Sequence, residues 1–178
     1  MRRVVHSLTL LGLVFVASSL SARELVVGDT GITFQAPDEF KVLSSEVMAA
    51  KWPSRRAPRW AVGNRTGGTT IAYDLKPHDI SQASADQLIG VFSQLFSRVV
   101  PGIVWQQRRT LDIDGRQWVH LEFTSNAIDT DIHNSLLATS YGDQMLVFNF
   151  NSTREEIKQY REALEASMMT ISLPPAGL

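Results

Sequence analysis

The stretch Val104–Asn151, VWQQRRTLDIDGRQWVHLEFTSNAIDTDIHNSLLATSYGDQMLVFNFN, decides the fold of this chain. It contains four segments rich in β-branched and aromatic residues, which are Val104–Ile113, Gln117–Ser125, Ile132–Tyr141 and Gln144–Asn151. Asp114-Gly115 separates the first pair and Gly142-Asp143 the last, and both dipeptides are typical of tight hairpins. The stretch therefore predicts an antiparallel meander of four strands that the rest of the chain must cover.

Alternation along these strands predicts that neither face of the sheet is cleanly polar. In the second strand one face carries Val119, Leu121 and Phe123, and the other carries Trp118, His120 and Glu122. In the last strand Leu146, Phe148 and Phe150 oppose Met145 and Val147. We expect one face to form a full core, and the other to lie partly open or under a helix.

Two amphipathic helices are predicted to flank this sheet. The first begins at Ser84, where Ser84 and Gln87 fit a capping box, and ends before Pro101-Gly102. Its apolar stripe consists of Leu88, Val91, Phe92, Leu95, Phe96 and Val99. The second is capped by the segment 153–156 and ends before Pro174-Pro175, with a stripe made of Ile157, Tyr160, Leu164, Met168 and Ile171. Leu95 and Phe148 are expected to be buried.

The region before the first helix predicts shorter strands. Glu24–Val27 and Ile32–Ala36 are predicted to form a hairpin, and Trp60–Asn64 is predicted to pair with Thr69–Leu75. Lys41–Val42 and Glu46–Lys51 are interpreted as short strands, and 76–83 as a loop. The whole pattern predicts one α+β domain over residues 23–178, with an antiparallel sheet of about six to seven strands.

Residues 1–22 have the pattern of a secretory signal peptide. Arg2 and Arg3 precede the mostly apolar run Leu8–Leu20, and small residues follow at Ser21-Ala22. Cleavage is expected to leave Ala22 or Arg23 as the mature N-terminus, in a periplasmic or secreted protein without stable membrane insertion. The alternative interpretation is an uncleaved N-terminal helix.

Charge and cysteine content exclude several classes of function. The chain has 17 Lys and Arg against 18 Asp and Glu; residues 1–22 hold two Arg and no acid, so the mature chain has formal charge −3. This mild acidity argues against a nucleic-acid binder, which needs a basic face. The chain has no Cys, which excludes thiol catalysis and Cys-ligated metal sites.

Three segments together resemble the PsbP-like fold. Gly31–Val42 resembles the opening strand, Pro turn and following aromatic of that family, although Phe40 stands where the family often has Trp. Leu111–Arg116 resembles its central hairpin, and Met145–Phe150, with the helix after it, resembles its close. The family includes lumenal extrinsic subunits of photosystem II, DcrB-like periplasmic proteins and a small Ran-GTPase release factor. The resemblance implies a binding or accessory role, and no catalytic motif accompanies it.

The segment Lys51–Trp60 is dense in the residue types found at binding hot spots. It contains Lys51, Trp52, Arg55, Arg56, Arg59 and Trp60, and two Pro residues stiffen it. These six residues are predicted to contact an acidic patch on a partner protein. The alternative is a solvated loop whose Trp rings fold onto the sheet and whose Arg residues pair with acids.

A second cluster consists of His120, Glu122, Asp129, Asp131 and His133. If the strands that carry them pair in the right register, His120, Glu122, Asp131 and His133 would converge and suit zinc or a similar divalent ion. A slip of one residue would send them to opposite faces and leave a polar sheet edge.

The function predicted from sequence is that of an exported, non-enzymatic, protein-binding module that needs no cofactor. It would serve as an accessory or envelope protein, or as an immunity-type protein that neutralises a periplasmic toxin. The alternative is a metal-dependent hydrolase that uses the His120/His133 cluster. Gly-x-Ser-x-Gly is absent from the sequence, so nucleophilic hydrolysis has no motif to support it.

Overall fold

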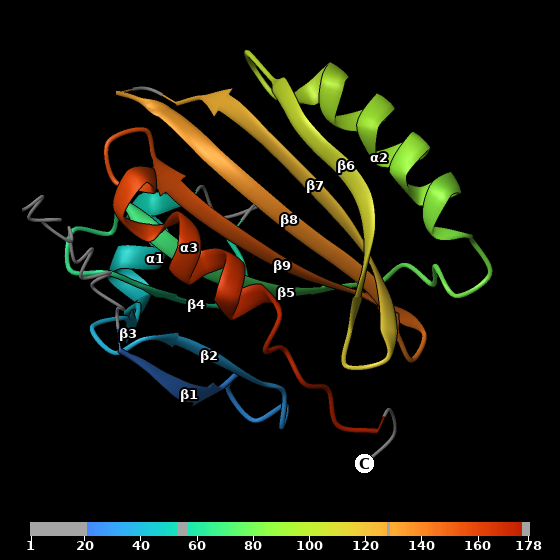
Figure 1. Cartoon of the computed structure of the whole chain (residues 1–178), viewed down its shortest axis with the longest axis horizontal. Coiled ribbons are helices and arrows are strands. Elements are labelled where there is room, and N and C mark those ends of the chain that lie inside the picture. Colours follow the sequence, from blue (N-terminus) through green and yellow to red (C-terminus); the bar gives the residue numbers. More distant parts are fainter. Residues whose placement is uncertain (1–20, 53–56, 128, 176–178) are drawn as a thin grey trace, which may run out of the picture.

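The computed structural model describes residues 21–52, 57–127 and 129–175 (Figure 1). This part of the chain contains, in order, β1 (Ala22–Val26), β2 (Thr33–Pro37), β3 (Lys41–Val42), α1 (Ser45–Lys51), β4 (Trp60–Gly63), β5 (Thr69–Lys76), α2 (Ala85–Val99), β6 (Val104–Ile113), β7 (Arg116–Asn126), β8 (Asp131–Tyr141), β9 (Gln144–Thr153) and α3 (Ile157–Met168). Seven strands form one sheet in the order β3-β4-β5-β9-β8-β7-β6, and β1 and β2 form a separate two-stranded sheet. All the pairings are antiparallel, so the predicted α+β class is confirmed.

The predicted meander is the run β6–β9. Asp114 and Gly115 have φ values of 54° and 69°, so they form the tight turn that their dipeptide predicts. The register of the β6–β7 hairpin shifts between Trp105 and Gln107, where β6 has a bulge. A bulge on an edge strand increases its twist and hinders pairing with other chains.

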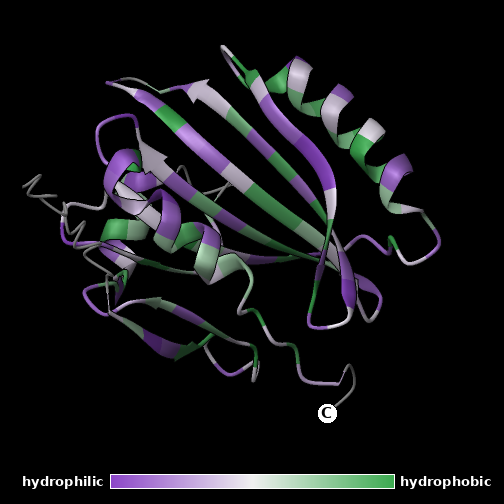
Figure 2. Ribbon diagram, in the orientation of Figure 1, coloured by the Kyte–Doolittle hydropathy of each residue, from purple (hydrophilic) through white to green (hydrophobic). Residues whose placement is uncertain are grey.

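The larger core fills the space between one sheet face, α3 and the β1–β2 hairpin. On this face the sheet contributes Trp118, Leu137, Leu146, Phe148 and Phe150, and the alternation of polar and apolar residues along the strands is visible in Figure 2. The hairpin adds Phe34 and the helix adds Leu164. This is the full core that the alternation along the strands predicts.

On the opposite face, α2 lies mainly over β7 and β6 (Figure 1). Val119, Leu121 and Phe123 form a smaller core there, against which partly buried residues of α2 pack: Leu88, Phe92 and Phe96. The predicted capping box is present, since the Ser84 hydroxyl accepts from the Gln87 amide and the Gln87 side chain accepts from the Ser84 amide.

The predicted stripe of α2 divides into two. Its other half, Val91, Leu95 and Val99, is 59%, 48% and 55% exposed. The prediction that Leu95 is buried is therefore wrong, whereas Phe148 is fully buried as expected. The two halves lie side by side on the helix, and only the one turned toward β7 finds apolar partners.

The segment predicted as the strand Glu46–Lys51 is the helix α1, so that prediction is wrong. The Ser44 hydroxyl caps it by accepting from the Val47 amide at 3.4 Å, and Glu46 lies in the first turn. Met, Ala and Lys then favour a helix. None of the residues of α1 is fully buried.

The start of α3 also differs from the prediction. β9 continues to Thr153, and α3 begins at Ile157 with Glu156 at the cap position and no side-chain cap. Within the described residues, none of the helices is long and apolar enough to cross a membrane. The predicted signal peptide 1–22 lies outside the described residues except for Ser21 and Ala22, and Ala22 begins β1.

Glu156 ties the β4–β5 turn to the start of α3. Its carboxylate accepts hydrogen bonds from Asn64 Nδ2 at 2.8 Å, from the Thr66 hydroxyl at 2.5 Å and from the Thr69 hydroxyl at 2.6 Å. Burial raises the pKa of Glu156, but these hydrogen bonds and the charge of Lys51 outweigh it and hold that pKa below its usual value.

Replacing Glu156 with Ala should lower the free energy of unfolding by about 2 kcal/mol, because hydrogen bonds to a charged group contribute about 1.5–3 kcal/mol. Glu155→Ala is the matched control: Glu155 is exposed, and the change should cost less than about 0.5 kcal/mol. Urea unfolding of both variants measures the difference. Equal losses in the two variants would contradict this role of Glu156.

Candidate functional site

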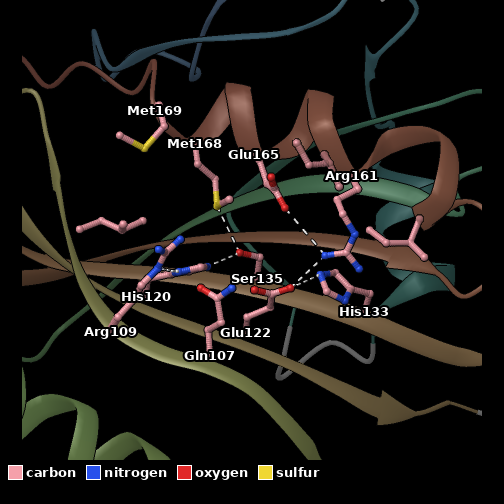
Figure 3. A pocket seen from close by; sticks show the side chains of 13 residues that line it. Gln107, Arg109, His120, Glu122, His133, Ser135, Arg161, Glu165, Met168 and Met169 are labelled. Atoms are coloured by element: carbon pink, nitrogen blue, oxygen red, sulfur yellow. Dashed lines mark hydrogen bonds and ion pairs between the residues drawn. The ribbon is translucent and has the colours of Figure 1, made fainter. Parts of the chain in front are cut away.

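A polar pocket of about 270 Å³ lies between α3 and the face of β6, β7 and β8 (Figure 3). The strand register assembles its floor, because Arg109 pairs with His120 and Glu122 pairs with Ser135 across neighbouring strands. Paired residues of an antiparallel sheet point to the same face. Arg161 and Met168 approach from α3, so residues far apart in sequence share one small space.

A chain of hydrogen bonds crosses this pocket, and in each bond the donor lies on the side of Arg109 and the acceptor on the side of Met168. Arg109 Nε donates to His120 Nδ1 at 3.3 Å, so the proton of a neutral His120 ring must lie on Nε2. His120 Nε2 lies 2.6 Å from the Ser135 hydroxyl and therefore donates to it. That hydroxyl donates in turn to Met168 Sδ at 3.2 Å. Ser135 thus receives a hydrogen bond from His120 and gives its own to a thioether.

The environment keeps His120 neutral. Burial, and next the charge of Arg109, lower the pKa of His120 to about 4, while Glu122 opposes them. His120 is only 2% exposed, and both of its ring nitrogens are engaged. A general base needs a free lone pair directed at the proton that it removes. The described geometry gives Ser135 no such base, so it is not set up as a nucleophile.

Glu122 is the buried charge of the pocket. Arg161 donates to its Oε1 at 3.1 Å, and His133 Nε2 lies 3.2 Å from the same oxygen. Arg161 also lies 3.8 Å from Glu165. Burial, and next the charge of Arg161, lower the pKa of His133, although Glu122 opposes them. An arginine and an imidazole therefore compensate a carboxylate that is 7% exposed, the arrangement that makes a buried charge tolerable.

The predicted metal cluster is brought together only in part. His120, Glu122 and His133 line the pocket, whereas Asp131 pairs with Arg154 at 3.6 Å and is about half exposed. Asp129 lies in the exposed turn between β7 and β8. Across the residues described, His, Asp and Glu form no group of three or more arranged to hold a metal ion.

The predicted partner-binding segment Lys51–Trp60 is described only at its ends, and Arg55 and Arg56 lie outside the described residues. Trp60 packs on the larger core, with its ring edge-on to Phe34 at 6.1 Å. Lys51 donates to the carbonyl of Gly67 at 2.7 Å, and its ammonium lies 5.5 Å from the centre of the Trp52 ring. The Trp60 ring thus folds onto the core, as the alternative interpretation of this loop predicts.

Arg59 is the fourth residue of the predicted partner-binding set that the structure describes. Its side chain is 56% exposed, and its Nε lies 3.7 Å from Oδ1 of Asp74. Lys76 also pairs with Asp74. One acid therefore faces two cations at this point of the surface, whereas the charge of Lys51 acts on Glu156.

A groove of about 480 Å³ runs between α1 and β4, next to this loop. Its walls are mostly apolar, with Met48, Ala49 and Trp52 on one side and Pro58 and Trp60 on the other. Arg59 stands at its border, and Lys51 lies at the end of α1. The groove combines rings, an aliphatic floor and a basic border, which are the features of a protein-docking site.

Comparison with known proteins bears on the fold. Neither family models nor curated proteins match the chain. Among solved structures, cyanobacterial PsbP (CyanoP) from Synechocystis sp. PCC 6803 superposes with TM-score 0.61 at 11% identity, covering 92% of this chain and 99% of its own. LpqN, involved in cell envelope biogenesis of Mycobacterium tuberculosis, gives 0.58 at 14% identity, covering 87% and 91%.

A third structure, of the Pseudomonas aeruginosa protein PA94, whose function is unknown, gives TM-score 0.52 at 14% identity, with 86% of this chain and 98% of that chain covered. Identities this low establish a shared fold and carry no site residue across. The match to PsbP extends over nearly the whole chain and agrees with the order of elements read from the sequence. This protein has the PsbP-like fold.

Proposed function

We propose that this chain is an extracytoplasmic, non-catalytic module that binds another protein through the groove between α1 and β4. The observation that carries the proposal is the groove itself, where Trp52 and Trp60 wall a mostly apolar space bordered by Arg59. Trp and Arg dominate binding energy at protein interfaces because they fill desolvated pockets. The occupant is a protein segment with an apolar anchor and acidic flanks.

Two further observations support the proposal. The pattern of residues 1–22 favours export, and one structural neighbour, LpqN, is described as involved in cell envelope biogenesis. In the polar pocket, the direction of the hydrogen bonds gives Ser135 no base, which supports a non-catalytic role. An accessory envelope role and an immunity role would differ in the partner and use the same groove.

A photo-crosslinking amino acid at position 49 tests this proposal in the native envelope. Ala49 is exposed and lines the groove, whereas Ala50, the next residue of α1, is exposed and does not line it. We expect one dominant protein adduct from position 49 and none of that mass from position 50. Equal adducts from both positions would contradict docking in the groove.

Charge reversal of Arg55 and Arg56 to Glu should weaken binding of that partner by slowing association, because like charges would then meet across the interface. The wild-type affinity should also fall as salt rises, since salt screens exposed charges. The melting temperature should barely change. Salt-insensitive binding that survives the double reversal would place the interface outside this loop; the sheet face around Trp118 and His120 is buried and could not supply it.

A further inference from the structure

A hollow of about 150 Å³ lies over β5 and β9, on the face of the large sheet that also carries α2. We call it the β5–β9 hollow. Most of its floor consists of alternate residues of these two paired strands, which point to the same face: Ala72, Asp74, Lys76, Val147, Asn149 and Asn151. Trp52 and Pro58 form a wall above this floor. The sheet register therefore assembles the hollow from segments that are far apart in sequence.

The floor of the hollow carries buried oxygens that lack a hydrogen-bond donor. Oδ1 of Asn149 and Oδ1 of Asn151 are both buried, and none of the described residues donates a hydrogen bond to either. Thr70 pairs with Asn151 across β5 and β9, and its buried hydroxyl also has no partner among the described residues. Leaving a buried polar group unpaired destabilises a fold, so each such group calls for an explanation. Three of them together on one sheet face indicate a place where an outside molecule supplies the donors.

The charges around the hollow favour an uncharged donor. Asp74 faces both Arg59 and Lys76, so the local balance of charge is positive and disfavours a metal ion or an ammonium group. An anion is disfavoured as well, because it would meet the acceptor oxygens of Asn149 and Asn151 and has no proton to donate to them. The molecule that fits must therefore donate through neutral hydroxyl or amide groups.

The wall and the size of the hollow favour a ring. Trp52 offers an aromatic surface, and Pro58 and Val147 offer aliphatic ones. A cavity of roughly 150 Å³ accommodates benzene, so one six-membered ring fits the available space. A sugar ring has C–H groups on its faces, which pack on aromatic rings, and hydroxyls around its edge. Each hydroxyl can both donate and accept, so it can satisfy either end of an Asn amide.

We propose that the β5–β9 hollow binds one uncharged sugar unit of a carbohydrate. The sugar hydroxyls donate to the oxygens of Asn149 and Asn151, and a further hydroxyl donates to the Asp74 carboxylate. The C–H face of the sugar lies against the Trp52 ring. Trp52 and Pro58 also line the α1–β4 groove, so the sugar and the partner protein bind on two sides of one wall. This site goes beyond the proposed protein-binding function, and each of the two can fail without the other.

NMR titration of the isotopically labelled protein with glucose, galactose, mannose and N-acetylglucosamine tests the proposal. At least one of these sugars should shift the side-chain amide signals of Asn149 and Asn151 and the indole signal of Trp52. A Kd of roughly 1–10 mM is expected for a ligand of about twelve non-hydrogen atoms. The indole of Trp105, which donates to Ser97 next to α2, should not shift. Absence of these shifts with all four sugars would overturn the proposal.

Acetamide is the control ligand for a protein occupant, because it carries the amide group without the sugar ring. It should shift the Asn149 and Asn151 signals more weakly than the best sugar at the same concentration. Equal or larger shifts with acetamide would overturn the proposal and assign the hollow to an amide of a protein partner.

Asn149→Leu separates a binding site from a structural polar patch. The change removes a buried oxygen that has no partner, so the melting temperature should rise by about 2–4 °C. The Kd for the sugar should rise about tenfold or more, because the acceptor is lost. Asn149→Asp keeps an acceptor oxygen at this position and should bind the sugar within about threefold of the wild type. Wild-type sugar affinity in Asn149→Leu would contradict the proposed site.

Discussion

Truncation of Phe148 to Ala is expected to lower the free energy of unfolding by about 3–5 kcal/mol. Phe148 is fully buried in the middle of β9. Its ring centre lies 5.7 Å from that of Phe34, 5.6 Å from that of Tyr73 and 6.3 Å from that of Trp118. Removing the ring would therefore leave a cavity, and the contact that joins the large sheet to the β1–β2 hairpin through Phe34 would be lost.

Leu95→Ala is the matched control, since it removes an apolar side chain of similar class that is 48% exposed. It should cost less than about 1 kcal/mol, mainly because little area is removed from water. Urea unfolding measures both variants. A loss from Leu95→Ala comparable with that from Phe148→Ala would contradict the described orientation of α2.

Acidification from pH 7.5 to pH 4.5 should cost about 2–3 kcal/mol of stability through His120 alone. The pKa of His120 is about 4 in the folded chain, and its usual value is 6.5. The unfolded chain therefore binds a proton at pH values where the folded chain does not. This contribution is fully present above pH 6.5 and is lost progressively as the pH falls toward 4.

His120→Gln should remove most of this pH dependence, because Gln does not titrate. The comparison must allow for the other groups that face His120. Arg109 keeps its charge throughout, and His133, with its pKa also lowered, adds a dependence of the same sign in both proteins. The lowered pKa of Glu156 acts only below its usual value of 4.5. Equal pH dependence in wild type and variant would contradict a neutral, buried His120.

The meander and part of the polar pocket could be predicted because short-range chemistry determines them. Asp114-Gly115 fixes a two-residue turn, and counting back from it pairs Arg109 with His120. The spacing of His120, Glu122 and His133 along the strands groups these three residues, but Arg109 joins them only when the hairpin register is counted. Arg161 and Met168 had no local signal, because their place depends on how α3 packs across the sheet.

The errors have equally specific causes. Periodicity predicted a broad apolar surface on α2 but could not tell which half faces the sheet, since Leu88, Phe92 and Phe96 have the same spacing as Val91, Leu95 and Val99. The seven residues of α1 make only about two helical turns, which is too short for a periodic signal, so the sequence pattern predicts a strand there although Ser44 is available as a cap.

The central claim is that a partner protein binds in the groove between α1 and β4. The most direct test measures how tightly the protein crosslinked at position 49 binds a variant in which a large side chain fills that groove. Ala49→Trp places a large ring in the groove between α1 and β4, and Ala50→Trp places the same ring on the next, exposed position outside it. Calorimetric titration should give a Kd raised about tenfold or more for Ala49→Trp and unchanged for Ala50→Trp. Wild-type affinity in the Ala49→Trp variant would show that the partner does not bind in this groove.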